Sequence, residues 1–113
     1  RYASRPLWVV WQPHTFSRTQ TLFDAFTSAF NQADHVIVSE VYASREKDNG
    51  FSAAQVVTAM QHADARFIPA LMDISNYLTT HLKKGDVLLV LSAGNADQIS
   101  RDVLVRLKEQ EAA

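Results

Sequence analysis

Side chains that can bind an anion are concentrated directly after the first apolar segment of the chain. His14 and Arg18 can carry positive charge, and Gln12 and Ser17 add hydrogen-bonding groups. Arg18 falls in the expected first turn of a helix, where the partial positive charge of the terminus disfavours a cation by up to about 1 kcal/mol. A carboxylate or phosphate bound there would relieve this repulsion. The residues therefore predict an anion site, with the alternative that Arg18 only reaches Asp24 or solvent.

The role of His14 is left open by its surroundings in the sequence. It follows Pro13 and could act as a general base, an anion ligand or a packing residue. No Gly-x-Ser-x-Gly elbow or partnered nucleophile is present, so nucleophilic catalysis is not expected. The chain has no cysteine, and its four histidines form no His-x3-His pair. We therefore expect neither a disulfide framework nor a metal site.

Two later polar segments follow other apolar runs. In the first, Glu40 lies inside an otherwise apolar strand just before Tyr42, where a buried carboxylate would need a partner. The alternative is an edge or strand-end position with access to water. Arg45 and Glu46 lie in a charged stretch that is typical of a solvated loop, so they are weaker candidates. In the second, residues 92–95 read Ser-Ala-Gly-Asn and resemble a shortened phosphate-binding turn. They lack both Gly-x-Gly-x-x-Gly and the Walker A lysine, so they predict only a tight turn.

Four apolar or β-branched runs alternate with helical patterns, which is typical of βαβ units around a parallel sheet. The expected strands are Leu7–Trp11, Val36–Tyr42, Arg66–Ala70 and Val87–Leu91. The first, second and fourth contain uninterrupted apolar runs, which predict burial on both faces. The predicted fold class is α/β, a Rossmann-like three-layer sandwich whose mostly parallel sheet carries helices on both faces. Such sheets bind ligands beyond the carboxyl ends of their strands.

The expected helices begin at recognisable capping residues. A helix over residues 18–31 has Ser17 and Gln20 as a capping box, and Ser52 opens a second helix over residues 53–62 with the same device. The apolar residues of both helices recur at three- and four-residue spacing, which places them on one face.

Two further helices are expected in the second half of the chain. Asp73 is a plausible cap for a helix that ends near the Lys-Lys-Gly of residues 83–85, where cations and a glycine favour termination. A fourth helix holds the apolar residues from Ile99 to Leu107 before a polar tail fades out from Glu109. No internal repeat interrupts this pattern.

Length and composition predict one domain over residues 1–113. The chain is 47% hydrophobic, enough for a core without disulfides, and its net charge of −1 without a basic stripe disfavours nucleic acid as a partner. No apolar run approaches the roughly 18 to 20 residues that span a bilayer, so no membrane partner is expected and a cytoplasmic location fits. The absence of an initiator methionine suggests a fragment cut at a domain boundary or a processed chain.

Three ordered motifs carry a family resemblance. Residues 12–19, followed by Leu22 to Phe26, resemble the Gln-Pro-His-x-aromatic-Ser/Thr-Arg-Thr stretch of the UDP-N-acetylmuramate:L-alanine ligases, which are Mur ligases. Residues 40–43 with Glu46, and residues 93–95, match later motifs of that family in the same order. The match spans nearly the whole chain. Three positions depart from the family pattern. Thr15 stands where many relatives carry a basic residue, Ser92 replaces the first glycine of their Gly-Ala-Gly turn, and Arg45 occupies a position often taken by glycine.

The resemblance implies the C-terminal, amino-acid-binding domain of such a ligase, which would close over and pack against an ATP-binding central domain. The whole enzyme would use ATP and Mg²⁺ to phosphorylate the carboxylate of UDP-N-acetylmuramate, and L-alanine would attack the acyl phosphate to give the amide. The central domain would bind most of the ATP and Mg²⁺. Because the family's phosphate loop is not among these 113 residues, the domain alone is expected to hold no cofactor and to be inactive.

By the same resemblance, His14 and Arg18 match positions that line the L-alanine site, where Arg18 would clamp the alanine carboxylate. The remaining substrate-binding candidates are motif positions with less defined roles, namely Gln12, Ser17, Tyr42 and Glu46. Two alternatives remain. One is the same domain of a related ligase, such as those that recycle cell-wall peptides or extend folylpolyglutamate. The other is a stand-alone Rossmann-like module with an anion-binding or regulatory role.

Overall fold

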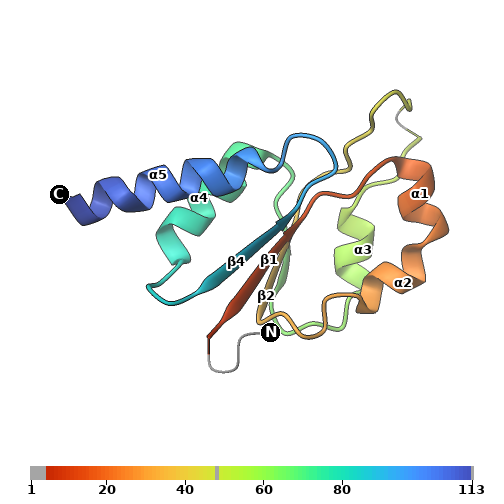
Figure 1. The fold of residues 1–113 in the computed structure, drawn as a ribbon. Coiled ribbons are helices and arrows are strands. Elements are labelled where there is room, and N and C mark those ends of the chain that lie inside the picture. The colour runs from red at the N-terminus through yellow and green to blue at the C-terminus, as the bar shows by residue number, and fades with distance from the viewer. Residues whose placement is uncertain (1–4, 48, 113) are drawn as a thin grey trace.

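Strands and helices alternate along the part of the chain that the computed structural model describes, residues 5–47 and 49–112. Figure 1 shows these elements, and the first and last strands have the bounds that the sequence predicts. In chain order they are β1 (Leu7–Trp11), α1 (Phe16–Thr21), α2 (Phe23–Ser28), β2 (His35–Val38), α3 (Ala54–Ala59), β3 (Ala65–Phe67), α4 (Leu71–His81), β4 (Val87–Leu91) and α5 (Gln98–Ala112).

The four strands form one parallel sheet in the order β3-β2-β1-β4. Trp8 of β1 lies opposite His35 of β2 on one side and Leu88 of β4 on the other. From β1 the chain adds β2 and β3 on one side and then returns to place β4 on the other side. The switch point of the topology therefore lies between β1 and β4, where open α/β sheets bind their ligands.

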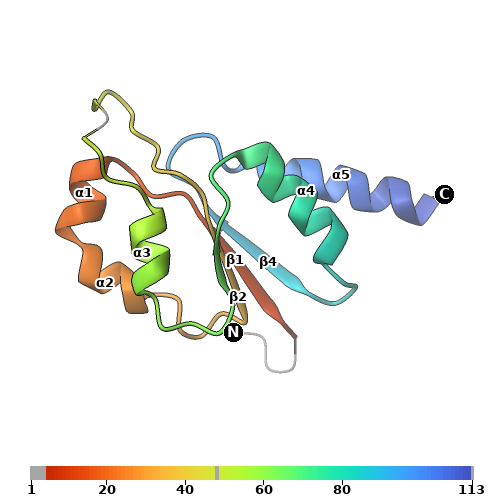
Figure 2. The ribbon, with the colours of Figure 1, turned by 180° about the vertical axis from the view of Figure 1, so that it is seen from behind.

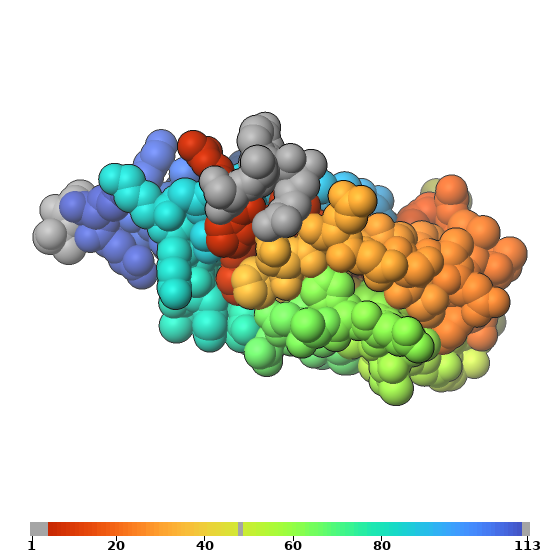
Figure 3. Space-filling model, turned by 90° about the horizontal axis from the view of Figure 1, so that it is seen from below, coloured from red at the N-terminus to blue at the C-terminus, as the bar shows by residue number. Residues whose placement is uncertain are grey.

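Helices cover both faces of the sheet, which confirms the predicted three-layer α/β fold. Figures 1 and 2 show α1, α2 and α3 on one side and α4 and α5 on the other. Residues of β1 alternate between the two layers, because Val9 belongs to the core under α1 to α3 whereas Trp8 and Val10 belong to the core under α4 and α5. Figure 3 shows the start of β1 between these two layers.

The single helix expected over residues 18–31 is wrong. The structure has two short helices separated at Leu22, whose φ of −103° and ψ of 21° depart from helical values. The break turns the chain along the sheet, so that the ring of Phe23 contacts Phe51 and the ring of Phe26 lies 4.5 Å from that of Trp11. Packing against the sheet therefore determines this segment more than its own periodicity.

The capping box expected from Ser17 and Gln20 does not form either. Thr15 is the N-cap of α1, and its hydroxyl oxygen accepts a hydrogen bond from the backbone N of Arg18 at 3.3 Å. The Gln20 side chain instead accepts a bond from the amide of Asn49 at 2.9 Å. The side chains of Ser17 and Gln20 therefore each bond to a residue 29 positions away, Ser17 to Glu46 and Gln20 to Asn49, and local spacing does not reveal such partners.

The second and third strands are shorter than expected. The run from Val36 to Tyr42 leaves the sheet after Val38, because the carboxylate of Glu40 accepts bonds from the backbone N of Val41 and of Ala53, each at 2.9 Å. This contact turns the chain toward α3 and gives Glu40 the partners that its position requires. The third strand ends at residue 67, two residues before a proline that has no N–H for the sheet.

The remaining helix boundaries also differ in detail. The helix α3 is shorter than the expected 53–62, although Ser52 does accept a bond from the backbone N of Ala54 at 3.2 Å. Asp73 lies in the first turn of α4 and is not its cap. The helix α5 continues through Glu109 to residue 112 instead of fading out. Among the described residues, no helix is both long and apolar enough to cross a membrane.

Burial separates β4 from the other apolar strands. The strands β1 and β2 are buried as predicted, but Leu89 and Leu91 of β4 are 46% and 39% exposed. The expectation that β4 is buried on both faces is therefore wrong. The physical reason is that β4 lies at an edge of the sheet, and the layer of α1 to α3 leaves it uncovered.

Candidate functional site

The three polar loops singled out in the sequence meet at the carboxyl edge of the sheet. Hydrogen bonds join Gln12, after β1, to Asn95, after β4. The segment after β2 contacts the start of α1 through Glu46 and Ser17, and Tyr42 forms an isolated parallel bridge with His14. All six predicted site residues therefore lie in this one region.

Gln12 organises the turn after β4. Its side chain is buried, and its Oε1 accepts bonds from the backbone N of Ala93 and Gly94 at 3.1 Å and of Ala96 at 3.3 Å. Its Nε2 donates to Oδ1 of Asn95 at 2.9 Å. Converging backbone N–H groups of this kind form anion-binding nests. Here an oxygen of the domain itself occupies the nest, which accounts for the likeness of this turn to a phosphate loop.

Tyr42 connects the loops after β1, β2 and β4. Its backbone N donates to the carbonyl of Pro13 at 2.8 Å, and its ring lies nearly parallel to that of His14 with centroids 6.3 Å apart. The same ring covers Gly94, where an added Cβ would lie 2.5 Å from Cζ of Tyr42. Glycine at this position therefore allows the aromatic ring to lie against the backbone.

Glu46 occupies the backbone N–H groups at the start of α1. Its carboxylate accepts bonds from the backbone N of Phe16 at 2.6 Å and of Ser17 at 3.1 Å, and from the Ser17 hydroxyl. The hydroxyl bond contributes most to lowering the pKa of Glu46 below 4.5, with smaller contributions from the two backbone bonds and the charge of His14, and partial desolvation opposes them. The anion expected at this helix start is thus supplied by the domain.

Arg18 and His14 line a cavity of about 460 Å³ at the switch point between β1 and β4. Both side chains are exposed, and among the described residues the Arg18 guanidinium makes no hydrogen bond or ion pair, to Asp24 or to any other group. Most of the other lining residues are apolar and include Phe26 and Leu91. The sequence does not reveal these apolar lining residues, because aromatic residues at helical spacing normally indicate a core.

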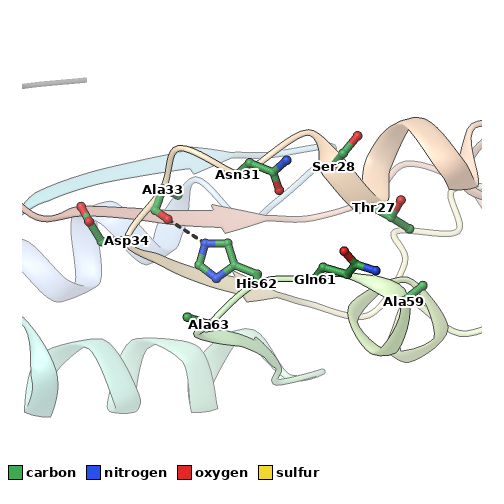
Figure 4. A pocket seen from close by; sticks show the side chains of 9 residues that line it. All are labelled: Thr27, Ser28, Asn31, Ala33, Asp34, Ala59, Gln61, His62 and Ala63. Atoms are coloured by element: carbon green, nitrogen blue, oxygen red, sulfur yellow. Dashed lines mark hydrogen bonds between the residues drawn. The ribbon is translucent and has the colours of Figure 1, made fainter.

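A larger cavity, of about 540 Å³, lies at the opposite edge, where β2 and β3 begin. Figure 4 shows it with His62, whose Nε2 lies 2.7 Å from the carbonyl of Ala33. The other ring nitrogen of His62 accepts a bond from the backbone N of Asp64 at 2.9 Å. Nε2 therefore joins the loop before β3 to the loop before β2, and Nδ1 bonds within its own loop. The cavity is lined by none of the predicted site residues. Among residues 5–47 and 49–112, no group of three or more potential ligands is arranged for a metal.

Comparison with known proteins gives relatives in sequence and in structure. The chain is 41% identical over 106 residues to a UDP-N-acetylmuramate–L-alanine ligase of Alkaliphilus metalliredigens, and 36% identical over 118 residues to one of Syntrophus aciditrophicus. These alignments cover 92% and 96% of this chain but 23% and 25% of the relatives, so the chain spans about a quarter of their length. No family model matches it.

In structure, the chain is similar to a UDP-N-acetylmuramate-alanine ligase from Thermotoga maritima. The TM-score is 0.74 at 21% sequence identity, and the match covers 96% of this chain and 22% of the Thermotoga chain. At this identity the likeness shows a shared fold, and it agrees with the relatives found by sequence.

Proposed function

The chain belongs to the Mur ligase family, in which it matches the C-terminal part of the UDP-N-acetylmuramate–L-alanine ligases, and we propose that it is the domain that binds the amino-acid substrate of such a ligase. The proposed substrate is L-alanine. Its carboxylate bonds to Arg18, and His14 adds a second polar contact. The proposal is supported by the family membership and by the position of both side chains at the switch point of the sheet.

The observation that carries the proposal is the Arg18 guanidinium, which has no partner among the described residues. It lies beside the start of α1, where Glu46 has already taken the backbone donors. The Arg18 guanidinium is therefore the positive group that stays available near this helix start. Its planar set of N–H donors suits a carboxylate that accepts two hydrogen bonds. A small amino acid offers such a carboxylate.

We propose that the other candidate residues act mainly by holding the loops. Gln12 fixes the turn after β4, and Glu46 with Ser17 ties the segment after β2 to α1. Tyr42 packs between His14 and that same turn. In this division of roles, these four residues position the two that contact the substrate.

In the proposed reaction, the γ-phosphoryl group of ATP is transferred to the carboxylate of UDP-N-acetylmuramate, which gives an acyl phosphate and releases ADP. The amine of L-alanine then attacks the acyl phosphate, forms the amide bond and releases inorganic phosphate. ATP and Mg²⁺ would be held mainly by a central domain of the ligase, over which this domain closes. The 113 residues contain no Gly-Lys-Thr or Gly-Lys-Ser phosphate loop, so we propose that ligation needs the rest of the enzyme.

Arg18→Ala in the full-length ligase tests the assignment. Losing a charged hydrogen-bonding partner costs about 1.5 to 3 kcal/mol, so the KM for L-alanine should rise about 10- to 100-fold. The KM for ATP should change little, because Arg18 is assigned to the amino acid. Steady-state kinetics with each substrate varied in turn gives both values.

Arg101→Ala is the matched control for this experiment. Arg101, on α5, is also exposed, but it pairs at 3.2 Å with Asp97, which directly precedes that helix, and it lines no part of the Arg18 cavity. Its loss should leave both KM values unchanged. An unaltered KM for L-alanine in Arg18→Ala, or an equal rise for ATP, would refute the carboxylate assignment.

A further inference from the structure

The turn that leads from β1 into α1 contains a strained residue. Thr15 has a φ of 59° and a ψ of 148°, close to a region of backbone conformation that essentially only glycine occupies. A side chain that branches at Cβ makes a positive φ still less favourable. Such strain persists only where the surrounding structure holds the backbone in place. The contacts of Thr15 must therefore hold this conformation.

Hydrogen bonds fix the backbone of Thr15 on both sides. Its N–H donates to the carbonyl of Tyr42 at 2.9 Å. Its carbonyl accepts two bonds from Thr19, one from the backbone N at 3.2 Å and one from the hydroxyl at 2.7 Å. Thr19 is fully buried in α1, and Tyr42 forms the isolated bridge with His14. Both anchors therefore belong to parts of the chain that are themselves fixed.

A glycine at this position would avoid the strain, but it would lack the hydroxyl group of threonine. Oγ1 of Thr15 accepts a hydrogen bond from the backbone N of Arg18 at 3.3 Å. The two preceding N–H groups of α1, those of Phe16 and Ser17, donate to Glu46. The Thr15 hydroxyl therefore holds the backbone of Arg18, the residue assigned to the substrate carboxylate.

The strained turn lies between the two side chains that the proposed function assigns to the substrate. His14 directly precedes Thr15, and Arg18 follows three residues later in α1, yet both line the same cavity. The backbone of a residue turns only about φ and ψ, so a change of φ at Thr15 would rotate His14 against the helix that carries Arg18. The conformation of Thr15 therefore sets the relative position of the two side chains.

We propose that Thr15 is a positioning residue for substrate binding. Its strained backbone places His14 and Arg18 at one cavity, and its hydroxyl fixes the backbone of Arg18 before the amino acid arrives. The strain lowers the stability of the fold, whereas the preorganised site raises the affinity for the ligand. The inference rests on the proposed function, in which His14 and Arg18 contact L-alanine.

Thr15→Gly and Thr15→Ala in the full-length ligase test the strain. Both substitutions remove the hydroxyl and the methyl group, and the two variants differ only in Cβ. Alanine is the more stabilising of the two at an ordinary position, whereas glycine is the more stabilising at a positive φ. The Tm of Thr15→Gly should therefore lie about 2 °C or more above that of Thr15→Ala. An equal or lower Tm for Thr15→Gly would overturn the inference.

The KM for L-alanine should follow the hydroxyl and not the stability. Thr15→Gly and Thr15→Ala both lose the bond to Arg18, so in both the KM should rise about 3- to 10-fold although their Tm values differ. Thr15→Ser keeps the hydroxyl, so its KM should stay within about 2-fold of the wild type. The KM for ATP should change in none of the three. A KM for L-alanine that tracks the Tm, or an equal rise in Thr15→Ser, would overturn the positioning role.

Ser44 provides the matched control for the strain. It is the other non-glycine residue with a positive φ among the described residues, 58°, and it does not line the Arg18 cavity. Ser44→Gly should also have a higher Tm than Ser44→Ala, but both should leave the KM for L-alanine unchanged. A rise in this KM equal to that of the Thr15 variants would contradict a specific role for Thr15.

Arg18→Ala, measured in the same series, separates this inference from the proposed function. A raised KM for L-alanine in Arg18→Ala together with an unchanged KM in Thr15→Ala would overturn the positioning role alone. An unchanged KM in both variants would refute the carboxylate assignment, and the positioning role with it.

Discussion

Two side-chain oxygens of the domain accept hydrogen bonds from backbone N–H groups that could otherwise bind an anionic ligand. The amide oxygen of Gln12 accepts bonds from the backbone of the turn after β4, and the carboxylate of Glu46 accepts bonds from the first backbone N–H groups of α1. Electrostatic reasoning from the sequence predicts positive potential near Arg18, but it cannot tell an anionic group of the domain from an anionic ligand. What distinguishes Arg18 is that its guanidinium makes no bond within the described residues.

Glu46→Gln should make the thermal stability of the ligase vary less with pH in the acidic range. A carboxyl whose pKa is lowered by folding stabilises the folded state above its ordinary pKa, 4.5, and this contribution disappears as the pH falls through the folded value. The Tm of the wild type should therefore exceed that of Glu46→Gln at pH 7, and the difference should shrink below about pH 4.5. Thermal melts from pH 3 to pH 7 measure it. Glu109→Gln, on the exposed end of α5, is the control, and a difference that is independent of pH would contradict the role of the charge.

Gln12→Leu should destabilise the fold by about 2 to 4 kcal/mol. The substitution leaves the backbone N–H groups of Ala93, Gly94 and Ala96 without their acceptor in a partly buried turn. Denaturant unfolding measures the loss. Gln61→Leu is the matched control, because Gln61 is exposed and its loss should cost less than about 0.5 kcal/mol. Equal losses would show that the buried amide contributes little.

Among the elements, those defined by local pattern are predicted well and those defined by distant contacts are not. The bounds of β1 and β4 follow from their apolar runs. The break at Leu22 does not, because packing of α1 and α2 against the sheet determines it. The end of β2 depends on the bond between Glu40 and Ala53, 13 positions away. A local reading of propensity and periodicity does not include such partners.

The same distinction applies to the site. The sequence predicts that loops at the carboxyl ends of β1, β2 and β4 meet, since this follows from the parallel topology alone. It does not predict that Ser17 bonds to Glu46 in place of Gln20, because the two side chains are 29 positions apart. Direct contact of Arg18 and His14 with L-alanine stays a prediction.

The helix α5 provides a comparison of two valines on one element. Val103 is 2% exposed against the sheet, whereas Val105 is 54% exposed. Val103→Ala should cost about 1 to 3 kcal/mol, because it removes two buried methyl groups and leaves a cavity. Val105→Ala should cost less than about 0.5 kcal/mol. Denaturant unfolding of both variants tests this, and similar losses would mean that α5 packs differently from the arrangement in Figure 1.

On the scale of the whole molecule, the two ends of the sheet differ in how their charges are used. At the end where the strands begin, the carboxylate of Asp64 bonds to His35 at 2.6 Å and to Arg66 at 3.1 Å. Burial acts to raise the pKa of Asp64, but these two partners outweigh it and hold the pKa below 3.8. Trp8 stacks on the His35 ring at 3.9 Å. At this end the charged groups pair with one another across the starts of β2 and β3, whereas at the opposite end the Arg18 guanidinium has no partner among the described residues.

The bonds from Gln12 to the turn after β4 join residues that are 81 to 84 positions apart. A folding chain closes so long a loop slowly, since the entropy of closure is lost before the contact stabilises anything. The turn can take its final shape only after β4 has docked beside β1. During synthesis on the ribosome, the edge of the sheet that carries Gln12 and Arg18 therefore assembles late, after β4 has been made.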